Sequence, residues 1–246
     1  MINCKEFYDG LLRRDVDFFT GVPDSLLANI NAYIMDNAPK ERHVIAANEG
    51  GAVAIAGGYH MSTGRIGLVY MQNSGQGNSM NPLVSFADTK VYSIPMLLLI
   101  GWRGEPGVKD EPQHARAGEI TLDVLNAWKI PYSIISKETS DLEKILDESV
   151  GSALSRNAPY ALVAKEGTFE KYELKNKDTD LYDLGREEAL KRVVSHLGEK
   201  DIIVSTTGKL SRELFEYRKN NSQPNDIQPH NKDFLTVGSM GHASSI

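Results

Sequence analysis

The chain has 246 residues, of which 41% are hydrophobic and 24% charged, as in an ordinary globular protein. Its net charge of −6 argues against nucleic acid or an anionic membrane as a partner. The single cysteine, Cys4, excludes an internal disulfide and a Cys-rich metal site, which fits a reducing compartment. No secretory pattern begins the sequence, and no run approaches the roughly 18 apolar residues of a membrane span. We therefore expect a cytoplasmic protein.

Short apolar runs alternate with longer amphipathic runs over the first two thirds of the chain, which is typical of a parallel sheet covered by helices. One predicted strand ends near Thr20, and the others cover residues 43–47, 66–71, 96–100, 132–135 and 160–164. The predicted helices cover residues 3–13, 23–35, 49–62, 78–86, 115–128 and 140–155. The sequence thus predicts one α/β domain over residues 1–165.

A charged segment without apolar periodicity follows, and we interpret residues 166–184 as a connection between domains. A second unit covers residues 185–246. Its predicted helices cover 186–197 and 210–218, its predicted strands cover 201–205 and 234–237, and GSMGHASSI resembles a turn that opens a third helix. Two strands cannot bury both faces of a sheet, so we expect this unit to be the truncated beginning of a larger domain.

Four glycine-rich or polar loops follow predicted strands. They are GVPDS (21–25), ANEGG (47–51), QNSGQGN (72–78) and the long loop over residues 101–114. In doubly wound sheets, ligands bind beyond the carboxyl ends of the strands. We therefore expect these loops to line one rim.

Glu49 stands between an apolar strand and an Ala/Gly-rich helix, GGAVAIAGGYH. By position alone, it could be a carboxylate that the helix N-terminus favours. The small residues of the helix point the other way, because they permit close backbone packing against a cofactor or a second subunit. Position leaves both interpretations open.

Two phosphate-binding motifs fail. QNSGQGN has glycines that would let backbone N–H groups approach an anion, but its spacing is not that of a dinucleotide-binding fingerprint. TTGKLS has Leu210 where a P-loop needs Ser or Thr. The sequence therefore argues against a nicotinamide-dinucleotide or NTPase site.

The loop WRGEPGVKDEPQH contains Arg103, Lys109 and His114, interleaved with three acidic residues. It could be a solvated surface loop. Its length and its place after a buried strand also suit an active-site cover. In that case Arg103 would bind an anionic substrate bidentately and Lys109 as a point charge. No neighbour at metal-ligand spacing accompanies His43, His60, His196 or His230.

Five ordered segments together resemble the phosphonopyruvate decarboxylase family of thiamine diphosphate enzymes, which is related to sulfopyruvate decarboxylase. The segments are GVPDSLL, NEGGAVAIAGGYH, QNSGQGNSMNPL, LLLIGWRGEPGVKDEPQH and TVGSMGHASSI. The resemblance covers essentially the whole chain. It implies a thiamine diphosphate-binding α/β fold, with parallel sheets flanked by helices. The first unit would be the pyrimidine-binding domain and the second the beginning of a diphosphate-binding domain.

The resemblance also implies roles for single residues. Glu49 corresponds to the glutamate that hydrogen-bonds N1′ of the aminopyrimidine and thereby activates the cofactor. Further cofactor-binding positions are Pro23, Asn78, Thr207, Gly208, Gly238, Met240, as the apolar wedge beneath the cofactor, and Gly241. Asp24 and Ser25 match positions that meet substrate, beside the cations Arg103, Lys109 and His114.

The family's metal motif would lie beyond Ile246, so no metal ligand is named, and Mg²⁺ is implied by the resemblance alone. The resemblance also implies a homo-oligomer, at least a dimer. We expect decarboxylation of 3-phosphonopyruvate to phosphonoacetaldehyde and CO₂, in 2-aminoethylphosphonate biosynthesis. The alternatives are a sulfopyruvate decarboxylase and a non-catalytic fragment or subunit that needs a partner to complete its site. We expect truncation of a longer chain.

Overall fold

The computed structural model describes residues 1–176, 183–198, 200–206, 208–221 and 230–235. It divides the chain into two compact units, Met1–Lys177 and Asp178–Ile246. Each unit is described by itself below. No helix among the described residues is both long enough and apolar enough to cross a membrane.

The first unit is built on a six-stranded sheet with the order β2-β1-β3-β4-β6-β5, and every pair of neighbouring strands is parallel. The strands are β1 Phe18–Gly21, β2 His43–Ile45, β3 Gly67–Gln72, β4 Leu97–Gly101, β5 Tyr132–Ile135 and β6 Tyr160–Ala164. Because all strands run the same way, their carboxyl ends meet at one edge of the sheet. The predicted parallel α/β architecture is confirmed.

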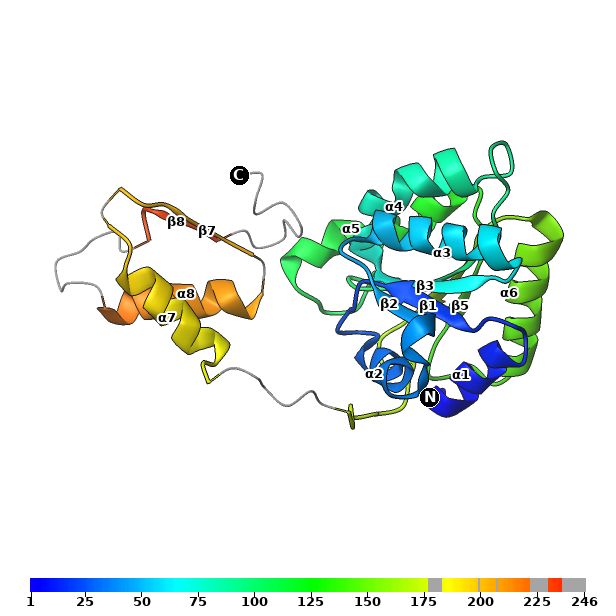
Figure 1. The fold of residues 1–246 in the computed structure, drawn as a ribbon, viewed down its shortest axis with the longest axis horizontal. Helices are drawn as coiled ribbons and strands as arrows, with labels where there is room; N and C mark the ends of the chain where they lie inside the picture. Colours follow the sequence, from blue (N-terminus) through cyan, green and yellow to red (C-terminus); the bar gives the residue numbers. More distant parts are fainter. Residues whose placement is uncertain (177–182, 199, 207, 222–229, 236–246) are drawn as a thin grey trace. The chain divides into compact units, whose positions relative to one another are not determined.

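Helices cover both faces of this sheet. They are α1 Cys4–Leu12, α2 Ala28–Asn37, α3 Glu49–Thr63, α4 Gln76–Pro82, α5 Pro112–Ala127 and α6 Leu142–Arg156. Short helical turns cover Lys40–Arg42, Asn73–Gly75 and Leu83–Ala87. In Figure 1, α3 and α4 lie on one side of the sheet, and α1 and α2 lie on the other. Each face has its own hydrophobic core, and the central strands β4 and β6 are buried along their whole length.

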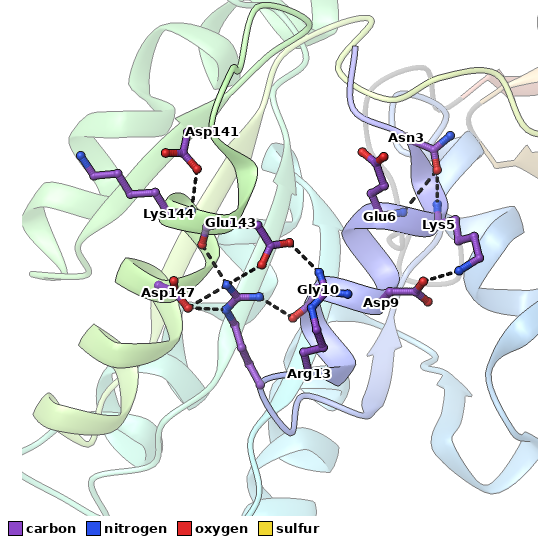
Figure 2. A network of polar contacts seen from close by, with 11 residues as sticks. Asn3, Lys5, Glu6, Asp9, Gly10, Arg13, Asp141, Glu143, Lys144 and Asp147 are labelled. Atoms are coloured by element: carbon purple, nitrogen blue, oxygen red, sulfur yellow. Dashed lines mark hydrogen bonds and ion pairs between the residues drawn. The ribbon is translucent and has the colours of Figure 1, made fainter.

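Charged residues join α1 to α6, two helices far apart in the sequence (Figure 2). Glu143 on α6 accepts hydrogen bonds from Arg13 and from Arg14, and Arg14 also pairs with Asp147. A second guanidinium N–H of Arg14 donates to the backbone carbonyl of Gly10 over 2.8 Å. The amino-terminal helix is therefore held against α6, which packs on β4, β5 and β6, by charge as well as by apolar contact.

The predicted connection over residues 166–184 differs from expectation in its first part. Phe169 is buried, and its backbone bridges to Ile2. The hydroxyl of Tyr172 donates to Asp36 over 2.9 Å, and the same carboxylate accepts the backbone N–H of Lys175. The charged composition predicted a connection between domains, whereas the first part of the segment packs on the first unit because Phe169 and Tyr172 anchor it.

Two helix starts differ from the prediction by at least three residues. The second helix begins at Ala28 rather than Pro23, because the carboxylate of Asp24 accepts the backbone N–H of Leu26 and holds a turn there. Helix α5 begins at Pro112, three residues before the predicted start, since proline is well tolerated in the first turn of a helix.

The described part of the second unit contains two helices and two strands. They are α7 Arg186–Ser195, β7 Ile203–Ser205, α8 Lys209–Asn221 and β8 Asp233–Leu235. The two strands pair in parallel, and Arg186 on α7 donates to Glu213 on α8. The predicted third helix in GSMGHASSI lies outside the described residues.

Candidate functional site

Glu49 is the first residue of α3, directly after the loop that leaves β2. Asn48 caps the helix, and its side chain accepts the backbone N–H of Gly51 over 2.8 Å. The side chain of Glu49 is buried, with 7% of its residue surface exposed. Its Oε2 accepts a 2.8 Å hydrogen bond from the side-chain amide of Asn78. The carboxylate is therefore held in one orientation at the carboxyl edge of the sheet.

The loop after β3 closes tightly around this carboxylate. A Cβ atom at Gly75 would lie 2.6 Å from Oε1 of Glu49, and a Cβ at Gly50 would lie 2.7 Å from the carbonyl oxygen of Asn78. A side chain at Gly75 would displace the Glu49 side chain or the loop, and a side chain at Gly50 would displace the backbone of Asn78. The glycines of QNSGQGN and ANEGG thus let two loops meet at one buried acid.

The turn after β1 places Asp24 beside the end of β4. A Cβ atom at Gly101 would lie 2.5 Å from Oδ2 of Asp24. Oδ1 of the same carboxyl is buried and has no hydrogen-bond partner among the described residues. Burial raises the pKa of Asp24 above its ordinary value, and the hydrogen bond from Leu26 and the charge of Arg103 oppose this rise. Pro23 and Ser25, on either side, are exposed.

A cavity of about 670 Å³ opens between this turn and the loop after β4. Its lining includes Ser25, Leu26, Trp102, Arg103, Gly104, Glu105, Val108, Lys109, Asp110, Glu111, Pro112 and Glu166. Arg103 crosses to the turn after β1, where its Nη1 donates to Oγ of Ser25 over 2.8 Å. The structure thus brings together the predicted substrate residues Ser25, Arg103 and Lys109.

Asp110 is the centre of the polar contacts in this loop. Both of its oxygens accept hydrogen bonds from the guanidinium of Arg103, through Nε and Nη2. The backbone N–H groups of Gly104 and Glu111 also donate to it, over 2.8 and 2.7 Å. Nδ1 of His114 lies 3.0 Å from Oδ1. The Arg103 guanidinium holds the pKa of Asp110 well below its usual range.

The charges of the cavity lining are mostly compensated. Arg103 is paired with Asp110, and Glu105 is paired with Lys165 at a distance of 2.5 Å. Lys109 is exposed and forms no ion pair with any residue that the structure describes. Within the described residues, Lys109 is therefore the cation of this lining that no carboxylate neutralises.

Asn73 was not singled out from the sequence, although it lies inside QNSGQGN. Its buried side chain accepts the backbone N–H of Arg103 over 3.2 Å and donates to the carbonyl of the same residue over 2.8 Å. It also donates to Oγ1 of Thr121 on α5. This side chain connects the loop around Glu49 to the loop that lines the cavity. Nothing in the sequence separates it from Gln72, Gln76 and Asn78, the other amides of the same segment.

In the second unit, Gly208 directly precedes α8 with a φ angle of +112°, a conformation that favours glycine. The predicted cofactor residues Thr207, Gly238, Met240 and Gly241 lie outside the described residues. No group of three or more His, Cys, Asp or Glu side chains suited to a metal ion occurs in the described ranges.

The fold and the site define a class. A parallel sheet with a buried glutamate at its carboxyl edge, at the start of a helix of small residues, is the arrangement expected of the pyrimidine-binding domain of thiamine diphosphate enzymes. The family model described as thiamine pyrophosphate enzyme, N-terminal TPP binding domain, matches residues 5–126. This range contains Glu49 and the whole loop after β4.

Several curated proteins are similar over long stretches. A phosphonopyruvate decarboxylase of Streptomyces viridochromogenes is 32% identical over the full chain, and the chain spans 62% of its length. The sulfopyruvate decarboxylase subunit alpha of Methanococcus maripaludis is 30% identical over 63% of the chain and is itself 90% covered. The chain therefore belongs to the family of thiamine pyrophosphate enzymes that contains phosphonopyruvate decarboxylase and the alpha subunit of sulfopyruvate decarboxylase.

A solved structure from Mycobacterium smegmatis, provisionally assigned to the thiamin diphosphate-dependent enzymes, superposes with a TM-score of 0.50. It is 17% identical, and the match covers 77% of this chain and 37% of that one. This likeness supports the fold.

Proposed function

We propose that the protein decarboxylates 3-phosphonopyruvate to phosphonoacetaldehyde and CO₂, with thiamine diphosphate as cofactor. The observation that carries this proposal is the buried, oriented carboxylate of Glu49 at the carboxyl edge of the sheet. Similarity to the Streptomyces phosphonopyruvate decarboxylases over the full chain supports the choice of substrate. A role in the biosynthesis of 2-aminoethylphosphonate belongs to the same proposal.

The residues around Glu49 fit the aminopyrimidine of the cofactor. A carboxyl group that must share a proton with a ring nitrogen needs a fixed position and little water around it. Asn78 supplies the first by its hydrogen bond to Oε2, and burial of Glu49 supplies the second. When bound, thiamine diphosphate supplies an electron sink for the carbon that loses CO₂. Glu49 would hold and return the proton that activates it.

The diphosphate end of the cofactor falls to the second unit in this proposal. Gly208 would let the backbone approach the diphosphate, and its positive φ angle suits such a turn. Thr207, Gly238, Met240 and Gly241 are proposed for the same end. Mg²⁺ is proposed as the ion that accompanies the diphosphate, since oxygen ligands and phosphate groups are its usual partners.

The cavity between Ser25 and Arg103 is the proposed site for the anionic headgroup of the substrate. Lys109 would contribute a charge and Arg103 its remaining N–H groups. Asp24 would lie at the inner end of this site, where its buried carboxyl reaches the end of β4. His114 is proposed for the same headgroup site, next to Asp110.

Sulfopyruvate is the second candidate substrate, and a specific observation favours it. The cavity lining contains four carboxylates, Glu105, Asp110, Glu111 and Glu166, against the two cations Arg103 and Lys109. Such a balance suits a sulfonate, which has one negative charge, better than a phosphonate with nearly two. The alpha subunit of sulfopyruvate decarboxylase is also the relative that the chain covers most completely among those described above.

We propose a homo-oligomer, at least a dimer, in which the two halves of the site come from different copies. The exposed small residues of α3, among them Ala54 and Gly58, permit another chain to approach closely. The alternative, a chain that is inactive until a partner completes its site, predicts cofactor binding only after that partner is added.

Decarboxylation assays on both substrates test the proposal. The natural protein, supplied with thiamine diphosphate and Mg²⁺, should release CO₂ from phosphonopyruvate with a kcat/KM above that for sulfopyruvate. A preference for sulfopyruvate would show that the proposed substrate is wrong and that the proposed decarboxylation is right. Release of CO₂ from neither substrate, with cofactor bound, would reject the proposed reaction.

A further inference from the structure

Arg103 does not reach the cavity as a free side chain, because Asp110 fixes it. An arginine has five N–H donors in a planar fork. Nε and one N–H of Nη2 are directed to Asp110, and one N–H of Nη1 is directed to Ser25. Two N–H groups, one on each terminal nitrogen, are left for a ligand. Their direction is set by the pairing with Asp110.

Asp110 is itself held by the backbone. The N–H groups of Gly104 and Glu111 donate to its two oxygens, and Nδ1 of His114 approaches Oδ1. The side chains of Asp110 and His114 are only 14% and 13% exposed. The loop therefore closes on this carboxylate, and Gly104 needs its φ angle of +68° to do so.

A carboxylate in the lining of an anion site opposes binding by its charge. It would favour binding only by acting through a cation that it orients. The lining contains four carboxylates, and each of them weakens the binding of an anion by its charge. Asp110 would therefore favour binding only if it orients a cation.

We propose that Asp110 is a positioning residue, which fixes the Arg103 guanidinium so that its free N–H groups meet the anionic headgroup of the substrate. The inference rests on the proposed function, in which this cavity binds that headgroup. The proposal goes further, because it makes the affinity of the cavity for an anion depend on Asp110, which acts by orienting Arg103.

The test asks whether neutralising Asp110 weakens or strengthens the binding of inorganic phosphate, measured by calorimetric titration. If Asp110 positions Arg103, Asp110→Asn should weaken phosphate binding by about tenfold, although it removes a negative charge. The matched control is Glu166→Gln, which removes the same charge from the same lining. Glu166 forms no hydrogen bond or ion pair with the residues that the structure describes, so its neutralisation should strengthen binding by about twofold.

A double-mutant cycle separates positioning from a general loss of structure. In an Arg103→Gln background, Asp110→Asn should no longer weaken phosphate binding. Equal weakening in both backgrounds would overturn the proposal, as would stronger binding by Asp110→Asn alone or an absence of phosphate binding by the wild-type protein.

A measurement on the unaltered protein covers the case in which Asp110→Asn does not fold. The Nε–H of Arg103 should exchange with water slowly in ¹⁵N NMR spectra, because it donates to a fixed carboxylate. Exchange as fast as that of free arginine would overturn the proposal. Phosphate binding with the expected signs, together with an absence of decarboxylation, would reject the proposed function and leave the role of Asp110 intact.

Discussion

The side-chain amide of Asn78 donates a 2.8 Å hydrogen bond to Oε2 of Glu49, while Oε1 faces the backbone of Gly75. The turn after β3 and the first turn of α4, which follow each other directly in the chain, therefore meet the two oxygens of the acid. The two residues come from different helices, α3 and α4, which pack against each other on the same face of the sheet. The orientation of Glu49 is a tertiary property, and the helix end alone does not determine it.

Replacement of Glu49 by glutamine keeps the shape of the side chain and an oxygen that accepts from Asn78, but removes the acid. We expect Glu49→Gln to bind thiamine diphosphate weakly but measurably, and to lose decarboxylation by about 100-fold or more. Titration of the cofactor and single-turnover CO₂ release measure the two effects separately. The control is Glu148→Gln, an exposed carboxylate of α6. Turnover close to that of the wild type would refute the role of Glu49.

The close approach of Gly75 to Glu49 makes a second prediction. Gly75→Ala introduces a Cβ 2.6 Å from Oε1, so the loop or the carboxylate must shift. Because a shift of about 1 Å at a reacting group can cost about 100-fold in rate, we expect a large loss of kcat. The melting temperature should change far less. Gly151→Ala on α6 is the matched control, since its Cβ would meet no atom within 4 Å. A similar loss of kcat in both variants would contradict this explanation.

Burial of Asp24 predicts a pH dependence of stability. Its pKa is raised in the folded protein, mainly by burial, so the unfolded chain releases the proton at a lower pH. The stability contributed by the protonated carboxyl is fully present below the unfolded pKa and is lost as the pH rises through the folded pKa. Asp24→Asn cannot ionise. Its free energy of unfolding should therefore exceed that of the wild type at neutral pH, and the difference should vanish towards pH 3.

Urea unfolding between pH 3 and pH 8 measures this difference. Asp123→Asn, an exposed carboxylate on α5, is the control, since it has no burial cost to remove. A stability difference for Asp24→Asn that stays constant over this range would show that folding does not shift the pKa of Asp24.

The sequence predicts the sheet well because its strands are nearly uninterrupted apolar runs. The run over residues 96–100 matches β4, and the Ala/Gly-rich helix begins at Glu49 as expected. Local pattern is sufficient in both cases, since burial on two faces requires a continuous apolar strand. The same pattern places the loops that follow these strands at one edge of the sheet.

Local sequence patterns do not predict which residues of different loops contact each other. Nothing in the order of charges within WRGEPGVKDEPQH indicates that Asp110, rather than Glu105, pairs with Arg103, because that choice depends on how the loop closes. The partner of Glu105 is Lys165, which comes from the end of a distant strand. The sequence therefore indicated which cations the loop carries, but not that Arg103 is already paired with Asp110.

The ion pairs between α1 and α6 differ in burial, and this difference makes a final prediction. The side chain of Arg14 is 12% exposed and donates to two carbonyl groups as well as to Glu143 and Asp147. Arg13 is 55% exposed, and its one ion pair among the described residues is with Glu143. Arg14→Ala removes a largely buried guanidinium together with its charge-assisted hydrogen bonds, so it should lower the free energy of unfolding by about 1–3 kcal/mol. Arg13→Ala should change it by less than about 1 kcal/mol, as for other exposed pairs. Urea unfolding at low and high salt measures both, and equal losses in the two variants would show that burial does not set the strength of these contacts.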